Sequence, residues 1–372
     1  MPAVDTQGAS LADAVIAWQA EFGRHGLPWQ GTQDPYRIWV SEIMLQQTQV
    51  STVLGYYDRF LGRFPSVATL ADADLDEVLR YWSGLGYYSR ARNLHACAKA
   101  IMAVHGGVFP VDPIALEALP GIGRSTAAAI AAFSAGVMAP ILDGNVRRVL
   151  CRVFAVEGFP GERAVLDQLW MIAQRELPQP GPGRIEAYTQ GLMDLGATVC
   201  LRARPRCEAC PVSGRCQARA QGRVDDLPTP RPRRSLELRT ADWVMICRGD
   251  RVLLERRPAS GLWGGLWSLP EVRAPRPSTV SDDTVDTAQV MVFLSQAFGL
   301  ASRHTPARLG VVRHVFTHFR LAATVWRINE VDDGWPALPG CEWLAWRDVE
   351  RAPLPKPVRT LLLDQQMRSL EA

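Results

Sequence analysis

Apolar residues recur at helical spacing through most of the first 228 residues. One such run follows Ser10, a residue type that caps helix N-termini, and another begins at Pro35, a residue type favoured in the first helical turn. Short turns rich in glycine and proline separate the later runs, and alternating strand-like patterns are rare. The pattern predicts an all-α region with short connections.

The pattern changes after the proline- and arginine-rich stretch at residues 228–237. Short runs of β-branched and aromatic residues follow, and Gly249-Asp250 between two of them predicts a β-hairpin. A single helical stretch lies at residues 287–298. We therefore expect a multidomain protein with a helical region over residues 1–228, a linker over residues 229–240 and an α+β domain over residues 241–372.

Composition places the chain among globular proteins, because 47% of its 372 residues are hydrophobic and 21% are charged. We expect a cytoplasmic protein, since no apolar run approaches the roughly 18–20 residues that cross a bilayer and no signal peptide is evident. The net charge of +3 says little alone. Arginines, however, gather in one segment, which fits either a solvated surface or contact with nucleic acid: Arg202, Arg204, Arg206, Arg215, Arg219, Arg223, Arg231, Arg233 and Arg234.

Four of the eight cysteines lie in the same segment, at Cys200, Cys207, Cys210 and Cys216. A cytoplasmic protein rarely builds a disulfide framework, so this group indicates a metal site. One C-x2-C pair does not by itself separate a zinc ion from an iron–sulfur cluster. The full C-x6-C-x2-C-x5-C spacing resembles the 4Fe-4S motif of the endonuclease III superfamily of DNA repair glycosylases.

The segment LPGIGRSTA, residues 119–127, places Gly121 and Gly123 in a turn that leads into a helix. Glycines allow close backbone approach, and free N–H groups at a helix start bind anions. A plain turn between helices would explain the two glycines alone. Their neighbours resemble the helix–hairpin–helix motif of the same superfamily, which holds a DNA phosphate without reading sequence.

Two carboxylates stand in contrasting surroundings. Glu42 lies among apolar residues, and burial would raise its pKa from about 4.3. Asp143 precedes a helix, whose backbone N–H groups and dipole favour the ionised form. A solvated helix stripe and an ordinary N-cap are the simpler interpretations. Taken together, we expect the two pKa values to separate, as suits a general acid paired with a stabiliser of an oxocarbenium-like centre.

The motifs WVSEIMLQQTQV, GLGYYSRARNL, LPGIGRSTA, ILDGNVRRVL and the cysteine group occur in one order. This order resembles the MutY family of adenine DNA glycosylases, which remove adenine mispaired with 8-oxoguanine, and the resemblance covers nearly the whole chain. It implies a six-helix-barrel subdomain at about residues 30–140. A second subdomain, about residues 1–29 and 141–228, would carry the 4Fe-4S cluster, and a Nudix-like domain would follow.

The resemblance also implies roles for single residues. Glu42 would protonate adenine and Asp143 would stabilise the sugar cation, with Asn145 beside it. The four cysteines would hold the cluster. The residues expected to contact DNA are Gln47, Leu85, Tyr87, Gly121, Gly123, Ser125, Thr317 and His318. The partner would be duplex DNA with an adenine:8-oxoguanine mispair, bound by a bacterial-type, nucleoid-associated monomer after the adenine flips out of the stack.

Two departures refine this expectation. Bifunctional relatives carry a lysine where this chain has Ser125, so it should remove a base without cutting the strand. The segment RPASGLWGGLWSLPE resembles the entry to a Nudix domain, but TVSDDT stands where the acidic Nudix helix should follow, and only Asp283 falls near an acidic position. We therefore expect no Mg²⁺ site, and instead recognition of 8-oxoguanine through Phe316-Thr317-His318, where the family often reads Phe-Ser-His.

Three other functions remain as alternatives at this point. They are a bifunctional enzyme acting on oxidised pyrimidines, a Nudix-type pyrophosphohydrolase with a DNA-tethering arm, and a non-catalytic DNA-binding module that holds zinc.

Overall fold

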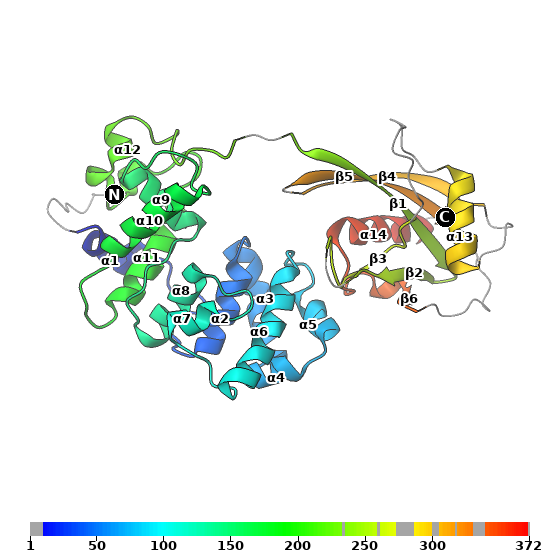
Figure 1. The fold of residues 1–372 in the computed structure, drawn as a ribbon, viewed down its shortest axis with the longest axis horizontal. Helices are drawn as coiled ribbons and strands as arrows, with labels where there is room; N and C mark the ends of the chain where they lie inside the picture. The colour runs from blue at the N-terminus through cyan, green and yellow to red at the C-terminus, as the bar shows by residue number, and fades with distance from the viewer. Residues whose placement is uncertain are drawn as a thin grey trace. The chain divides into compact units, whose positions relative to one another are not determined.

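The computed structural model describes residues 10–232, 235–258, 261–272, 286–299, 305–316, 318–329 and 339–370. The chain divides into two compact units (Figure 1). The helical unit comprises residues 1–81 and 90–233, and the sheet unit comprises residues 82–89 and 234–372. Among the helices described, none combines the length and the apolar character needed to cross a membrane.

The helical unit is built from helices and short connections, as the periodicity predicts. Ser10 caps the first helix and Pro35 opens the second, both as expected. The helices are α1 (Leu11–Phe22), α2 (Pro35–Leu45), α3 (Val50–Arg63), α4 (Val67–Asp72), α5 (Leu75–Trp82), α6 (Ser89–His105), α7 (Pro113–Glu117), α8 (Arg124–Ala135), α9 (Gly144–Val153), α10 (Arg163–Arg175), α11 (Arg184–Thr198) and α12 (Gln217–Ala220), with 3₁₀ turns at Cys207–Ala209 and Ser213–Arg215.

One core of the helical unit joins the first helix to helices that follow much later in the chain. Buried residues of α1 pack with those of α8, α9, α10 and α11. Helices α1 and α11 approach closely because Gly191 has no side chain, and a Cβ there would lie 2.7 Å from Val15 Cγ1. The carboxylate of Asp194 is fully buried and accepts hydrogen bonds from the Arg24 backbone amide at 2.8 Å and from Arg24 Nε at 2.6 Å. These contacts fix the α1 segment against α11.

Among its described residues, the sheet unit contains a mixed six-stranded sheet and two α-helices. Strands β1 and β2 are antiparallel and meet at Gly249-Asp250, as predicted, whereas β1 and β5 are parallel. The first strand begins at Glu237, inside the segment expected to be linker. The strands are β1 (Glu237–Arg248), β2 (Arg251–Arg256), β3 (Trp267–Ser268), β4 (Ala307–Val315), β5 (Phe319–Ile328) and β6 (Cys341–Ala345), and the helices are α13 (Thr287–Phe298) and α14 (Lys356–Leu370), with a 3₁₀ turn at Trp346–Asp348.

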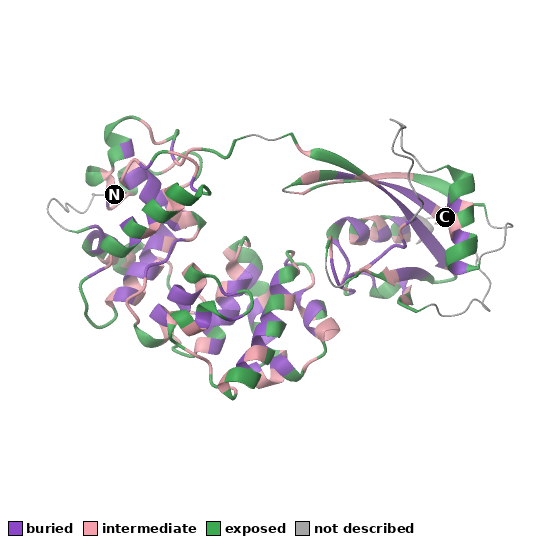
Figure 2. Cartoon of the chain, in the orientation of Figure 1, coloured by how far each residue is buried: buried purple, intermediate pink, exposed green. Residues whose placement is uncertain are grey.

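Both faces of this sheet are covered, which explains why β1 is apolar over consecutive residues. Trp243 and Met245 pack on one side with residues of α14, while Val244 and Ile246 pack on the other with residues of α13. Figure 2 shows β1 exposed at its start and buried farther along. The α+β domain predicted for this part of the chain is therefore confirmed.

Residues 82–89 belong to the sheet unit although they lie between α5 and α6 in the sequence. The Tyr88 hydroxyl donates to the Leu354 carbonyl at 3.3 Å, and the Ser83 hydroxyl donates to the Ala352 carbonyl at 3.3 Å. Nothing in the sequence pattern indicated this grouping, because hydrogen bonds between residues more than 260 positions apart leave no periodic signal.

Candidate catalytic site and cysteine loop

Glu42 lies on α2, a helix that is buried over most of its circumference. The Asp34 side chain caps this helix by accepting from the Tyr36 amide at 2.9 Å. The surrounding protein removes water from the Glu42 carboxyl, and the nearby negative charge of Asp143 adds to the effect. Together they raise the pKa of Glu42 from 4.5 to about 8. The carboxyl is therefore mostly protonated at neutral pH, as a general acid requires.

Asp143 is the N-cap of α9, where its Oδ1 accepts from the Val146 amide at 2.8 Å. Backbone hydrogen bonds act to lower its pKa, as the sequence led us to expect, and so do the charges of Arg148 and Arg147. Burial outweighs them, however, and the pKa of Asp143 is raised from 3.8. The expectation that the two environments act in opposite directions is therefore wrong for Asp143, because a helix cap inside the protein also loses hydration.

Helix α9 connects Asp143 to the cysteine segment. Arg148, near the middle of this helix, donates to Asn145 Oδ1 at 2.9 Å and to the Cys200 carbonyl at 2.7 Å. Asn145 in turn lies against α11, where a Cβ on Gly196 would come within 2.5 Å of its Cβ. Asn145 is thus held on two sides, and its Nδ2 lies 3.5 Å from Asp143 Oδ2.

The predicted hairpin is formed by α7 and α8. Gly121 has a φ of 78°, and a Cβ there would lie 2.6 Å from Asn93 Cβ, so this turn requires glycine. Gly123 is the N-cap of α8 and supplies no side-chain hydrogen bond to it, and open space surrounds its Cβ position. The first N–H groups of α8 therefore have room for an anion such as a phosphate.

The first turn of α8 also contacts the segments that carry both carboxylates. Ser125 Oγ accepts from the Leu142 amide at 2.9 Å, directly before Asp143. Thr126 Oγ1 accepts a hydrogen bond at 3.3 Å from Nε2 of Gln46, a residue that lies four positions after Glu42. The Ser125 hydroxyl is thus engaged within the protein. Sequence reasoning missed Gln46 and Thr126, since their pairing across 80 residues becomes visible only in the fold.

Two of the residues expected to contact DNA share an unusual backbone. Gln47 has a φ of 57° and Tyr87 a φ of 48°, the left-handed region that non-glycine residues rarely occupy. Both side chains are exposed, that of Tyr87 with 54% of its residue surface. A strained backbone persists only where the surrounding fold holds it in place, and such positions cluster at functional sites. Leu85, by contrast, is only 5% exposed, so in this structure it is not presented to a partner.

Of the recognition loop, Thr317 lies outside the described residues, while His318 is exposed beside the start of β5. The Phe316 amide donates to the Phe319 carbonyl at 2.9 Å, and the two rings stack with centroids 4.5 Å apart. The Phe316 ring also contacts Trp263 at 5.4 Å. This aromatic base, which fixes both ends of the loop, was not expected from the sequence.

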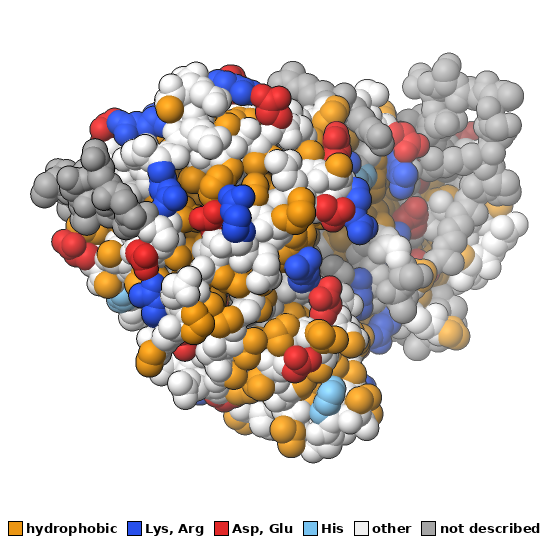
Figure 3. All heavy atoms as spheres, turned by 60° about the vertical axis from the view of Figure 1, so that its left-hand side comes forward, with side chains coloured by type: hydrophobic (Ala, Val, Ile, Leu, Met, Phe, Trp, Pro, Cys, Tyr) orange, Lys and Arg blue, Asp and Glu red, His pale blue; other side chains and the backbone are white. Residues whose placement is uncertain are grey.

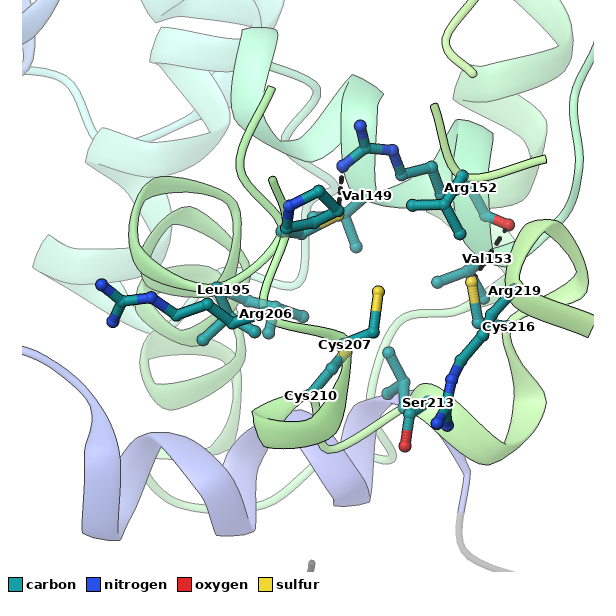
Figure 4. A pocket seen from close by; sticks show the side chains of 15 residues that line it. Val149, Arg152, Val153, Leu195, Arg206, Cys207, Cys210, Ser213, Cys216 and Arg219 are labelled. Carbon is teal, nitrogen blue, oxygen red and sulfur yellow. Dashed lines mark hydrogen bonds between the residues drawn. The ribbon is translucent and has the colours of Figure 1, made fainter. Parts of the chain in front are cut away.

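The cysteine segment encloses one cavity. All four predicted cysteines line it, and Figure 4 shows the sulfurs of Cys207 and Cys216 pointing into the same space. Arg152, which is 2% exposed, donates to Cys200 Sγ at 3.4 Å and to the Leu201 carbonyl at 2.6 Å. Among the described residues, no set of three or more His, Cys, Asp or Glu side chains is arranged to hold one metal ion. The four cysteines line the wall of the cavity.

Several arginines of this loop are exposed, but part of the positive charge is neutralised. Arg219 lies 3.0 Å from Glu208, and Arg223 lies 2.8 Å from Glu157. Arg202, Arg204, Arg206 and Arg215 are exposed as well. Figure 3 shows acidic and basic side chains interspersed over the face that it brings forward.

In the sheet unit, TVSDDT lies outside the described residues, and α13, the first helix described after the Nudix-like entry, carries no carboxylate. Its sequence is TAQVMVFLSQAF, and its Val290, Leu294 and Phe298 are buried against the sheet. Asp283 lies outside the described residues. This helix is a packing element, so it offers no ligands for a divalent cation.

Comparison with known proteins gives two domain matches. Residues 40–175 match the model of the HhH-GPD superfamily of base excision DNA repair proteins, and residues 242–364 match that of the NUDIX domain. A solved thermostable thymine-DNA glycosylase superimposes with a TM-score of 0.51 at 28% identity, covering 56% of this chain and 95% of that one.

Two relatives found by sequence similarity are both named adenine DNA glycosylase. The adenine DNA glycosylase of Rattus norvegicus is 35% identical and covers 91% of this chain, matching 74% of the rat protein. That of Buchnera aphidicola (subspecies Baizongia pistaciae) is 37% identical over 69% of this chain and 72% of its own length.

The raised pKa of Glu42 predicts how the stability of the protein depends on pH. Between pH 4.5 and about 8 the unfolded chain loses this proton while the folded chain retains it, so Glu42 destabilises the fold increasingly as the pH rises through that window. Glu42→Gln removes the ionisation. We expect the Tm of Glu42→Gln to exceed that of the wild type by a few degrees at about pH 9, because 1 kcal/mol shifts Tm by roughly 2–4 °C. At about pH 5 the difference in Tm should be much smaller.

The matched control is Glu21→Gln, because Glu21 is an exposed glutamate on α1. Thermal unfolding of the three proteins across the pH range measures the difference. A Glu42→Gln difference in Tm that does not change with pH would contradict the raised pKa.

Proposed function

Because this chain belongs to the adenine DNA glycosylase family, a group of base-excision repair enzymes, we propose that it releases adenine mispaired with 8-oxoguanine in duplex DNA. The observation that carries the proposal is the burial of the Glu42 carboxyl near Asp143, which raises its pKa to about 8. A neutral carboxyl on a buried helix, close to a second carboxylate, is the arrangement that departure of a purine needs.

The proposed reaction breaks the N-glycosidic bond of an adenine that has left the base stack. The bonding electrons pass to the adenine, and Glu42 donates its proton to the departing base. The sugar is left with positive charge, which Asp143 stabilises through its carboxylate. Water then adds to the sugar carbon and loses a proton, so the products are free adenine and an abasic site. Asn145 and the Val146 amide keep Asp143 oriented.

The sheet unit would supply recognition of the opposite base. Phe316 stacks on Phe319 and contacts Trp263, so the residue at the start of the predicted recognition loop is held in place, and His318 beside it is exposed. The missing carboxylates of α13 argue against pyrophosphate hydrolysis as the role of this unit. Adenine mispaired with guanine would be a second substrate.

The chain would act without cutting the DNA backbone. Lyase chemistry of this superfamily needs an amine near the hairpin that forms a Schiff base with the sugar. Ser125 occupies that place, and its hydroxyl accepts a hydrogen bond from the Leu142 amide. A hydroxyl so engaged holds the Asp143 segment in place and forms no imine.

Cys200, Cys207, Cys210 and Cys216 would hold a 4Fe-4S cluster, since all four line one cavity and their spacing resembles the 4Fe-4S motif. When bound, the cluster would supply structural cross-links between the turns of this loop. Arg152 orders the same loop through the Leu201 and Leu227 carbonyls. The exposed arginines beside the cysteines are then presented toward DNA phosphates.

Adenine release should depend on the protonated form of Glu42. We expect the single-turnover rate on a duplex with adenine opposite 8-oxoguanine to fall as the pH rises through about 8. Glu42→Gln should lower the rate by at least about 10²-fold, because the amide donates no proton. The comparison duplex carries adenine opposite thymine and should release little adenine. Unchanged excision by Glu42→Gln would exclude this mechanism.

The absence of lyase chemistry predicts an intact product strand. After adenine release the strand should break only when alkali is added, and borohydride should trap no covalent protein–DNA adduct. Gel analysis with and without each reagent measures both. A trapped adduct would show that another amine of the chain serves as nucleophile.

The cluster predicts a brown protein with visible absorption and about four irons per chain. Cys207→Ser should lose most of this colour, because Cys207 lines the cavity. Cys341→Ser is the matched control, since Cys341 lies on β6, away from the four cysteines in the sequence, and should keep it. A colourless wild-type protein that contains zinc would refute the assignment.

A further inference from the structure

Arg90, the second residue of α6, is an arginine buried within the helical unit, with 7% of its surface exposed. Its Nη1 donates to the carbonyls of Ile43 at 2.8 Å and Met44 at 2.7 Å. Its Nη2 donates to Thr48 Oγ1 at 2.9 Å. One guanidinium group therefore contacts three oxygens on a segment more than 40 residues earlier in the chain.

The two carbonyls lie at the C-terminal end of α2, where a helix has no further turn to satisfy them. This end also carries the negative pole of the helix dipole, which stabilises a buried cation. Ile43 follows Glu42 directly, so the hydrogen bond to its carbonyl fixes the backbone that carries the acid.

The third contact fixes the other side of the turn that contains Gln47. Met44 precedes this left-handed residue and Thr48 follows it, and Arg90 bonds to both. A left-handed conformation costs a non-glycine residue about 1–2 kcal/mol, so it persists only where neighbouring contacts enforce it. Arg90 supplies such contacts at both ends of the turn.

We propose that Arg90 is a positioning residue that sets the Glu42 carboxyl and the exposed Gln47 side chain in one fixed relation. This inference rests on the proposed function, in which Glu42 protonates adenine, and on the expected contact of Gln47 with DNA. Arg90 acts through position, since burial and Asp143 are the causes that raise the Glu42 pKa. Lysine would not replace it, because one ammonium nitrogen does not reproduce the planar fork that spans the helix end and Thr48.

The test compares Arg90→Lys with Arg63→Lys. Arg63 also forms a two-pronged contact, donating from Nε and Nη2 to Glu77 at 2.6 and 2.8 Å, but at the far end of α3. For Arg90→Lys we expect faster amide hydrogen exchange in residues 43–50 and an excision rate about 10–100-fold lower. The fall in rate with pH should still occur near 8, because the charge at this site is retained. Arg63→Lys should leave exchange in residues 43–50 and the excision rate unchanged.

A milder variant, Thr48→Val, removes one of the three contacts and keeps Arg90. Its effect on the excision rate should combine with that of Arg90→Lys less than additively, whereas the effects of Thr48→Val and Arg63→Lys should add. Additive effects of the first pair, or unchanged exchange in residues 43–50 of Arg90→Lys, would overturn the proposal. If the wild type releases no adenine, the proposed function fails, and the exchange comparison still decides whether Arg90 orders this turn.

Discussion

The proposed chemistry of this protein depends on the removal of water from one carboxyl group. A glutamate in water would be ionised at neutral pH and have no proton to donate. Glu42 keeps its proton because α2 is buried on most sides and because Asp143 adds a like charge nearby. Burial of this carboxyl costs free energy, which favourable contacts elsewhere in the fold must offset. The hydrogen bonds that join the segments of α2, α8 and α9 are such contacts.

Helices α8 and α9 relate the catalytic residues to the surfaces expected to meet DNA. The first turn of α8 follows the glycine hairpin and contacts both the Gln46 side chain and the Leu142 amide. Helix α9 begins at Asp143, and through Arg148 it reaches the carbonyl of Cys200. A phosphate bound at the hairpin would therefore lie one helical turn from side chains that hold both carboxylate segments. The proposed phosphate site and the two carboxylate segments are thus linked by a few hydrogen bonds.

Local patterns in the sequence predicted much of the fold and of the site. The helical region, the Ser10 and Asp143 caps, the glycine hairpin and the turn at Gly249-Asp250 depend on neighbouring residues, and the structure contains each of them. The net direction of the Asp143 pKa depends on burial, which one stretch of sequence does not determine, and that expectation was wrong.

Contacts between distant segments could not be predicted because they arise only when helices pack. Arg90 shows this most clearly. In the sequence it is one of the two arginines of α6, yet in the fold it bonds to the end of α2 and to both sides of the Gln47 turn. Residues such as Gln47 and Tyr87 remain exposed in a strained conformation only if buried groups resist their relaxation. The residues that position such a site are therefore the buried groups that form hydrogen bonds with the segments on either side of a strained residue.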